Sequence, residues 1–444
     1  MSAWQDLVTA SLLGTDRAAV PVIPVPGSAS LDGAPADPAA LVLDHAALLT
    51  AARRGGRQPG RAGPAAGTAA EPETAPVVSR AAGRRLARLL GGEHAELLPE
   101  WLTTAAGRGR RVPAVLLPAL LHQARRAAVA GPELQWLTAA AGGSRARWLA
   151  GLNAEWSFVL AYAPADEDAW RLGDAAQRRG YLAALRARNP GAARELIAAS
   201  WDAAGPGERV MFLGAIADRL SLADEPLLDG ALDDRHAGVR TAAAALLAAL
   251  PGSGLSARMA GRARACLWLD PGRPDPRLVV SPPGECSAAM RRDGITPVAG
   301  ARAALGVNRD LLLLAVIART PVRTWTDGFG MRPAEILDLT LGSWAPVLFA
   351  GWSRAAISQR DQEWMAALTN LALTRGLPVW LVPAGVSGPG TLRLLARHVD
   401  PALIAPGPGA GVAGPVGAAI RDALDTLRFR HQMLRELEDD DGAG

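Results

Sequence analysis

Three segments in the middle of the chain align with one another at an offset of 31 residues. Large apolar residues recur at this offset, at Leu185, Ile216 and Leu247. The apolar residues around each of them follow steps of three and four, which is the spacing of one face of a helix. A repeat of this length indicates stacked helix pairs, because each pair can bury its apolar face only against a neighbouring pair. We therefore predict an all-α fold, an α-solenoid of helix pairs, with this repeat in residues 166–250 and no strand within it.

An arginine recurs with the same period, at Arg178, Arg209 and Arg240. Each arginine falls near the start of the second helix of its pair, and two interpretations are open. In the structural one, the guanidinium groups bond turn carbonyls or the carboxylates of Asp202 and Asp233 and form a ladder along the stack. In the functional one, they line a groove that captures acidic partners or phosphate. We favour the structural ladder.

The pattern of helical periodicity, proline and glycine divides the chain into five parts. The predicted parts are an N-terminal helix and extended segment (1–52), a flexible low-complexity loop (53–80), helical repeats (81–256), a Pro/Gly-rich insert with possible short strands (257–308) and a C-terminal helical half (309–444).

All 47 basic residues are arginine, and this excludes several classes of site. Without lysine there is no P-loop of the usual type, no Schiff-base lysine and no SxxK nucleophile. The glycines Gly409, Gly411 and Gly414 spell GxGxxG but lack the strand and the βαβ context of a dinucleotide site. The histidines are scattered without zinc-ligand spacing. We expect no cofactor and no metal.

The net charge of +4 is small, and acidic residues interrupt the arginine clusters. We therefore expect no dedicated nucleic-acid surface. The 2 cysteines form no CxxC pair, which suits a reducing compartment. We find neither a signal peptide nor an apolar run long enough to cross a bilayer. These features predict a cytoplasmic protein without a membrane segment.

A partner would dock on the outward positions of the second helices, because these helices usually line the extended face of a solenoid. In this chain those positions include Arg179, Arg186, Glu208 and Asp218. Their mixed charge suits a protein partner better than a polyanion. We predict that this set forms the partner-binding surface.

Three stretches resemble an uncharacterised bacterial family of HEAT-like helical-repeat proteins. They are LVTASLLGTDR (7–17), FLGAIADRLSLADEPLLDGALDDRHAGVRTAAAALLAALPGS (212–253) and MRRDGI (290–295). The resemblance implies HEAT-like helix pairs and a gene beside those of a MoxR-type AAA+ ATPase, a von Willebrand factor A protein and a SWIM zinc-finger protein. It implies no catalytic residues. The ATPase and the von Willebrand factor A protein are therefore the expected partners.

These observations favour a non-enzymatic scaffold or adaptor that mediates protein–protein interaction, in a MoxR/von Willebrand factor A chaperone-like system. An alternative is a HEAT-like DNA-binding protein that resembles the alkylpurine DNA glycosylases. A third is an enzyme with a pocket in the segment 270–300.

Overall fold

The protein is built almost entirely from α-helices. The computed structural model describes residues 3–20, 37–55, 69–127, 133–161, 167–270, 276–295, 307–339, 342–375, 388–405 and 414–438. In these ranges the regular elements are the helices α1 to α22, short 3-10 helices and one small sheet of two strands. This arrangement confirms the predicted all-α helical-repeat fold.

Contacts divide the chain into two units, Met1–Ala70 and Glu71–Gly444. In the first unit, α1 (Ala3–Leu13) packs against α2 (Pro38–Gly55) and buries Leu7 between them. Leu12 on the same hairpin is 82% exposed, because two helices offer only one contact face. The predicted N-terminal helix is therefore present, and residues 21–36 and 56–68 lie outside the described residues.

The segment that follows the first unit is held in an extended conformation on the second unit. The N–H of Val78 donates to the carbonyl of Arg111 at 3.1 Å, and the N–H of Arg111 donates to the carbonyl of Pro76 at 2.9 Å. The carboxylate of Glu73 accepts the N–H groups of Ser144 and of the residue after it, at 3.1 and 2.8 Å. The prediction of a flexible loop across 53–80 is therefore wrong for the end of that range. There the side chain of Glu73 caps a helix that restarts after the kink at Gly143.

The second unit opens with five helices that share one hydrophobic core. Leu86, Trp101 and Leu121 lie in this core and are fully buried. The helices are α3 (Arg80–Leu90), α4 (Leu98–Gly107), α5 (Leu117–Arg126), α6 (Glu133–Leu152) and α7 (Phe158–Ala161).

The 31-residue repeat folds into three consecutive helix pairs. The pairs are α8 (Glu167–Arg171) with α9 (Ala175–Arg188), α10 (Pro190–Ser200) with α11 (Pro206–Ile216), and α12 (Glu225–Ala231) with α13 (Ala237–Ala248). The second helices lie side by side, since α9 contacts α11 and α11 contacts α13. The described residues from 167 to 250 contain no strand, as predicted.

The equivalent apolar positions of the three pairs point into one core. Ile216 and Leu247 are 0% exposed. Leu185 is only half-buried, although it packs against the same core. The prediction of burial is therefore confirmed for two of the three positions and too strong for the first pair.

The predicted insert begins later than residue 257. That position lies inside α14 (Gly254–Cys266), which packs against α13 and so continues the helical array. After it, β1 (Leu267–Leu269) pairs antiparallel with β2 (Leu278–Val280), so the expected short strand is present. α15 (Ala288–Arg292) follows. Residues 271–275 and 296–306 lie outside the described residues.

The C-terminal half is helical, as predicted. Trp325, Trp352 and Trp364 form a buried cluster in it, with neighbouring ring centroids 6.3 and 5.5 Å apart. Its helices are α16 (Val307–Ile317), α17 (Arg323–Phe329), α18 (Pro333–Asp338), α19 (Ala345–Gln359), α20 (Gln362–Arg375), α21 (Gly388–His398) and α22 (Gly414–Glu438).

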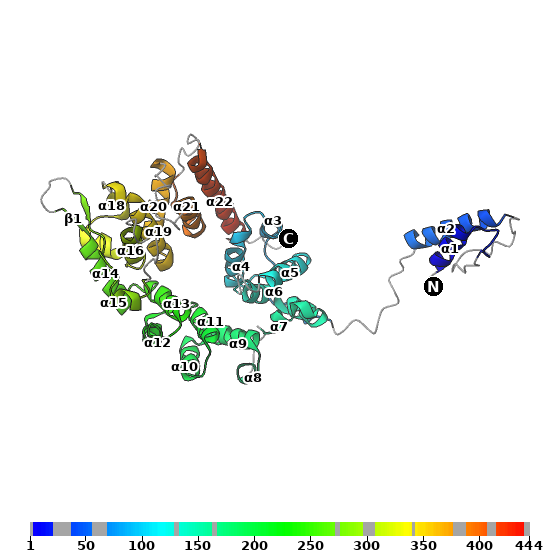
Figure 1. Cartoon of the computed structure of the whole chain (residues 1–444), viewed down its shortest axis with the longest axis horizontal. Helices are drawn as coiled ribbons and strands as arrows, with labels where there is room; N and C mark the ends of the chain where they lie inside the picture. Colours follow the sequence, from blue (N-terminus) through cyan, green and yellow to red (C-terminus); the bar gives the residue numbers. More distant parts are fainter. Residues whose placement is uncertain are drawn as a thin grey trace. The chain divides into compact units, whose positions relative to one another are not determined.

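Helix α22 joins the last part of the second unit to its first helices (Figure 1). Its first half supplies Ile420 to the core that the repeats share with the C-terminal helices, and its second half supplies Met433 to the core of α3 to α7. Two ion pairs fix the junction, Arg85 with Glu436 and Arg430 with Glu100, each at 2.6 Å. The array of helices in this unit is therefore closed by α22 rather than open at that end.

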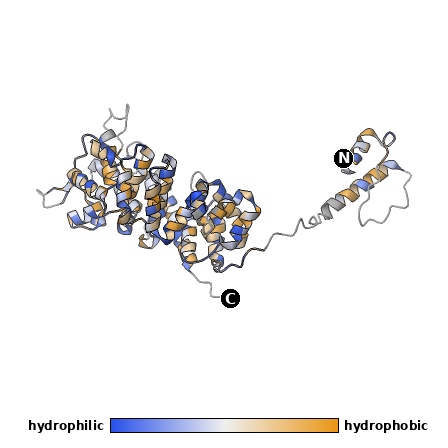
Figure 2. Ribbon diagram, turned by 90° about the horizontal axis from the view of Figure 1, so that it is seen from below, coloured by the Kyte–Doolittle hydropathy of each residue, from blue (hydrophilic) through white to orange (hydrophobic). Residues whose placement is uncertain are grey.

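Hydrophobic and hydrophilic residues alternate around most helices, as Figure 2 shows. This pattern is typical of helices that bury one face and expose the other. None of the helices in the described part of the chain combines the length and the apolar character needed to span a membrane.

Candidate functional site

The three repeating arginines all bond the turn that precedes their own helix. Arg178 donates to the carbonyl of Gly173 at 3.2 Å, and Arg209 donates to the carbonyl of Trp201 at 3.1 Å. Arg240 donates to the carbonyl of Asp234 at 2.7 Å. Each guanidinium therefore satisfies carbonyl groups that a turn would otherwise leave without a partner.

The carboxylates of this ladder differ from the predicted ones. Arg178 pairs with Glu208 at 2.8 Å, and Arg209 pairs with Asp234 at 2.6 Å. Arg209 bonds Asp202 through the backbone carbonyl of that residue, at 3.5 Å, and not through the predicted carboxylate. The predicted carboxylate of Asp233 binds Arg292. Arg178 and Arg209 each bind an acidic residue of the helix pair that follows their own. This is possible because neighbouring second helices lie side by side. Each ion pair therefore links two successive helix pairs.

The prediction that Arg186 faces outward is wrong. Its side chain and that of Asp224 are both 0% exposed, and they form a bidentate ion pair at 2.9 and 2.7 Å. The same guanidinium donates to the carbonyls of Asp218, Ile216 and Arg219 at the end of α11, at 2.7, 3.2 and 3.0 Å. One arginine of α9 therefore caps α11 and holds the residue that precedes α12.

Hydrogen bonding keeps the buried carboxylate ionised. Burial alone would raise the pKa of Asp224, but hydrogen bonds from Arg186, from the backbone N–H of Ser221 and from Arg194 outweigh it and lower the pKa below its ordinary value. The pair is therefore a buried ion pair with its acceptors satisfied, and it links three consecutive helix pairs.

A signal for the position of Arg186 exists in the sequence. Arg186 follows the fully buried Leu182 by four residues, which places both on one face of α9. The 31-residue register could not reveal it, because alanine stands at the equivalent positions 217 and 248. An arginine on an apolar helix face predicts a buried ion pair. The sequence pattern does not tell which residue of another helix is the acidic partner.

The remaining predicted binding residues are placed as follows. Asp218 is exposed in the turn after α11, and Arg179 is half-buried on α9. Glu208 is engaged by Arg178. The four predicted residues therefore do not form one free surface, and Arg179 and Asp218 remain accessible.

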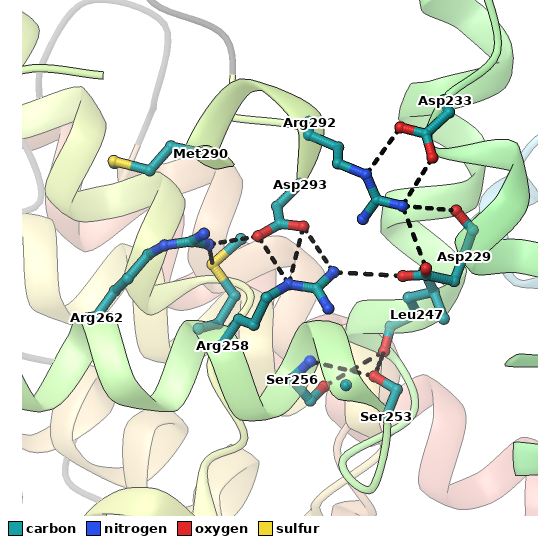
Figure 3. A network of polar contacts seen from close by, with 12 residues as sticks. Asp229, Asp233, Leu247, Ser253, Ser256, Arg258, Arg262, Met290, Arg292 and Asp293 are labelled. Atoms are coloured by element: carbon teal, nitrogen blue, oxygen red, sulfur yellow. Dashed lines mark hydrogen bonds and ion pairs between the residues drawn. The ribbon is translucent and has the colours of Figure 1, made fainter. Parts of the chain in front are cut away.

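A second polar network gathers around the MRRDGI segment (Figure 3). Asp293 is almost fully buried. Its carboxylate accepts hydrogen bonds from the guanidinium groups of Arg258, at 2.7 Å, and Arg262, at 2.6 Å. Both arginines lie on α14, whose first turn is fixed by the hydroxyl of Ser253 accepting the N–H of Ser256 at 3.2 Å. The network therefore joins α14 to the end of α15.

The neighbouring arginine of this segment turns toward α12. Arg292 pairs with Asp233 at 2.8 Å and with Asp229 at 3.2 Å. Arg258 also reaches Asp229, at 3.4 Å. The pKa of Arg292 is raised by its hydrogen bonds to Asp233 and Asp229, and that of Arg258 chiefly by Asp293. Three arginines thus face three aspartates, so the cluster is charge-balanced.

The backbone of Gly294 completes this contact. Its φ is +80°, and a Cβ atom there would lie 2.5 Å from the Cβ of Ala244 on α13. Its carbonyl accepts Arg319 at 3.0 Å. Glycine is required both by the backbone conformation and by the close approach of α13.

We expect Gly294→Ala to lower the free energy of unfolding by about 1 to 3 kcal/mol, through strain and overpacking. Urea unfolding followed by circular dichroism measures the change. The matched control is Gly261→Ala, because Gly261 is exposed within α14 and has open space around its Cβ position. This control should be neutral or stabilise by up to about 1 kcal/mol. Equal effects of both substitutions would contradict the close packing of Gly294.

The chemistry of these clusters is that of structural cross-links. In both networks the aspartates are bound by guanidinium groups, which leaves them poorly suited to act as bases. Within the described ranges, no group of three or more His, Cys, Asp or Glu side chains could hold a metal ion. Of the glycines of the GxGxxG pattern, Gly409 and Gly411 lie outside the described residues, and Gly414 begins α22.

Residues 6–382 match the model of one protein family, a family of unknown function designated DUF5691. The chain belongs to this family. No curated protein and no solved structure matches it. The match includes most of the first unit and runs through the repeats, the MRRDGI network and α20. It ends before α21 and α22, so the helix that closes the second unit lies beyond the matched region of DUF5691.

Proposed function

We propose that this DUF5691 protein is a non-enzymatic scaffold or adaptor that binds another protein. The observation that supports the proposal is the stack of α9, α11 and α13, whose successive pairs are linked by the arginine contacts described above. A stack of helix pairs offers an extended surface made from many residues. Such a surface suits a macromolecular partner better than a small substrate.

The pairing of the arginines favours a protein over a nucleic acid as the partner. Arg178 and Arg209 are bound to carboxylates. Among the first helices of the second unit, Arg108 pairs with Glu438 at 3.1 Å and Arg125 pairs with Glu155 at 3.0 Å. Nucleic-acid affinity depends on positive charges that are free to neutralise phosphates. Partnered arginines contribute less to such a surface.

The proposed partners are a MoxR-type AAA+ ATPase or a von Willebrand factor A protein, and the proposed compartment is the cytoplasm. The support for these partners is the resemblance carried by residues 7–17, 212–253 and 290–295. Affinity purification of the tagged chain from its native host, followed by identification of the retained proteins, tests this proposal. Retention of neither protein would contradict the choice of partners.

We expect the double variant Arg179→Glu/Asp218→Arg to weaken partner capture by roughly fivefold or more, because like charges then oppose each other across the interface. The exchange leaves the net charge unchanged. Quantitative affinity purification measures the captured amount, and circular dichroism verifies that the variant is folded.

The matched control exchanges two exposed charges elsewhere, Arg332→Glu/Asp425→Arg, and should leave capture unchanged. If the folded Arg179→Glu/Asp218→Arg variant captures as much partner as the unmodified chain, the docking surface does not lie on α9 and α11. Absence of any captured protein with the unmodified chain would contradict the scaffold itself.

A further inference from the structure

The second half of α22 packs on one face of α3 and α4, here called the α3/α4 face, over a core that is built mainly without it. The buried residues of that core come from residues 78–159, except for Phe429, Met433 and Leu437 of α22. These three residues follow one another at steps of four, so they share one side of the helix. The second half of α22 is therefore an amphipathic helix laid onto helices that have a core of their own.

Charged residues of the α3/α4 face fix the direction in which this helix lies. Glu100 on α4 accepts Arg430 at 2.6 Å. Farther along, Arg85 on α3 pairs with Glu436 at 2.6 Å and donates two hydrogen bonds to its carboxylate. A helix laid in the reverse direction would place like charges against each other. The α3/α4 face therefore selects a helix with an arginine near its start and a glutamate near its end.

The same face also caps the end of the helix. The hydroxyl of Ser79 donates to the carbonyl of Glu436 at 2.8 Å, and Arg108 donates to the carbonyl of Leu437 at 3.2 Å. Carbonyl groups of a last turn have no partner within their own helix. Arg108 also pairs with Glu438 at 3.1 Å. The α3/α4 face thus fits the C-terminal end of a helix that carries acidic residues there.

The aromatic anchor of the helix leaves one donor of the α3/α4 face unused. The guanidinium carbons of Arg85 and Arg88 lie 4.5 and 5.0 Å from the ring centroid of Phe429, and the ring of His94 lies 4.7 Å from it. Nη1 of Arg85 is buried and has no hydrogen-bond partner among the described residues. A buried donor without a partner costs free energy. A helix that offered a further acceptor to Arg85 would therefore bind this face more tightly than α22 does.

We propose that the α3/α4 face binds an amphipathic helix of a partner protein, and that α22 occupies this site until the partner helix displaces it. The inference rests on the proposed scaffold function and names the chemistry of the partner. The partner helix carries an aromatic residue, apolar residues four and eight positions later, and acidic residues at its end. The family match supports the proposal, since residues 6–382 include α3 and α4, whereas the present occupant α22 lies beyond them.

The probe for this site is a fluorescein-labelled peptide with the sequence of residues 424–438, titrated with the full chain and followed by fluorescence anisotropy. In the unmodified chain α22 is tethered, at a roughly millimolar effective concentration, and should exclude the peptide. The double variant Phe429→Ala/Met433→Ala loosens α22 and leaves the α3/α4 face intact. It should bind the peptide at least about tenfold more tightly than the unmodified chain. The matched control Asp425→Ala/Arg428→Ala removes an exposed ion pair of the same helix and should not increase binding.

Two changes in the peptide test the charged contacts. Glu436→Gln removes the charged partner of Arg85 and should weaken binding to the double variant roughly tenfold. Arg428→Gln is the control, because the side chain of Arg428 is 71% exposed on α22. It should change the affinity by less than about twofold. Equal affinities of the three peptides, or no peptide binding by the folded double variant, would overturn the site.

Hydrogen exchange of the unmodified chain tests the displacement without any substitution, and so it decides even if the double variant does not fold. If α22 leaves the α3/α4 face, the amides of residues 429–435 exchange through a local opening. Their protection should then be at least about tenfold lower than that of the buried turns of α4. Equal protection of the two segments would show that the second half of α22 is a permanent part of the core and would overturn the displacement.

Partner capture separates this inference from the proposed function. The double variant should capture roughly threefold more of a host partner than the unmodified chain, and excess peptide should reduce this capture. If capture is the same in both and the peptide does not reduce it, the α3/α4 face is not the docking site and the scaffold proposal stands. If the double variant binds the peptide but no form of the chain captures a host protein, the scaffold proposal is contradicted, and the partner helix with it.

Discussion

Replacing Asp224 with alanine is expected to lower the free energy of unfolding by about 3 to 5 kcal/mol, the range for breaking a buried ion pair by removing one partner. The substitution leaves the guanidinium of Arg186 buried without a counter-charge, since both side chains are 0% exposed. It also removes the acceptor for the N–H of Ser221. Urea unfolding followed by tryptophan fluorescence measures the loss.

The control for this prediction is Asp218→Ala. Asp218 is exposed, and Arg186 bonds only its backbone carbonyl, which the substitution keeps. We expect a change within about 0.5 kcal/mol, as for most surface substitutions. A similar small loss for Asp224→Ala would show that the ion pair does not hold the helix pairs together.

Acid should reduce the difference between the unmodified chain and Asp224→Ala. The pKa of Asp224 is lower in the folded chain than its ordinary value of 3.8, so folding favours the ionised form. Its stabilisation is present above the unfolded-state pKa and is lost as the pH falls through the folded-state pKa. Unfolding free energies of both proteins, measured from neutral pH downward, should therefore converge below about pH 4.

Replacing Ile216 with alanine is expected to cost about 2 to 5 kcal/mol of unfolding free energy, the usual range for a large-to-small change in a packed core. Ile216 is 0% exposed and lies in the core shared by the three helix pairs. Neighbouring helices close the cavity only in part, so contacts are lost as well as apolar area. Thermal and urea unfolding measure the effect.

Leu185→Ala is the matched control, because Leu185 occupies the equivalent position of the preceding pair but is only half-buried. Its substitution should cost clearly less than that of Ile216, since less apolar surface returns to water. A larger loss at Leu185 would contradict the packing of the repeat.

The sequence alone determined the helical repeat. Ile216 and Leu247 are buried at equivalent positions, and Arg178, Arg209 and Arg240 each bond a turn, because helical spacing and a fixed period are properties of local sequence. Short stretches such as MRRDGI also pointed to an uncharacterised family, and the match of residues 6–382 to a family of unknown function agrees with this.

The tertiary structure alone decided which charged groups meet. Arg186 lies on a buried helix face, but its partner Asp224 is 38 residues away on another helix pair. Asp293 meets Arg258 and Arg262 only because α15 folds back onto α14. The separations differ from pair to pair, at 38, 35 and 31 residues, so the period alone does not predict which groups meet.

The same reason applies to the closure of the second unit. Helix α22 reaches α3 across more than 300 residues, as the pair of Arg85 with Glu436 shows with a separation of 351. The periodicity of the sequence determines which face of each helix is apolar. Which residues are buried and which charges pair depends on helices that are distant in sequence.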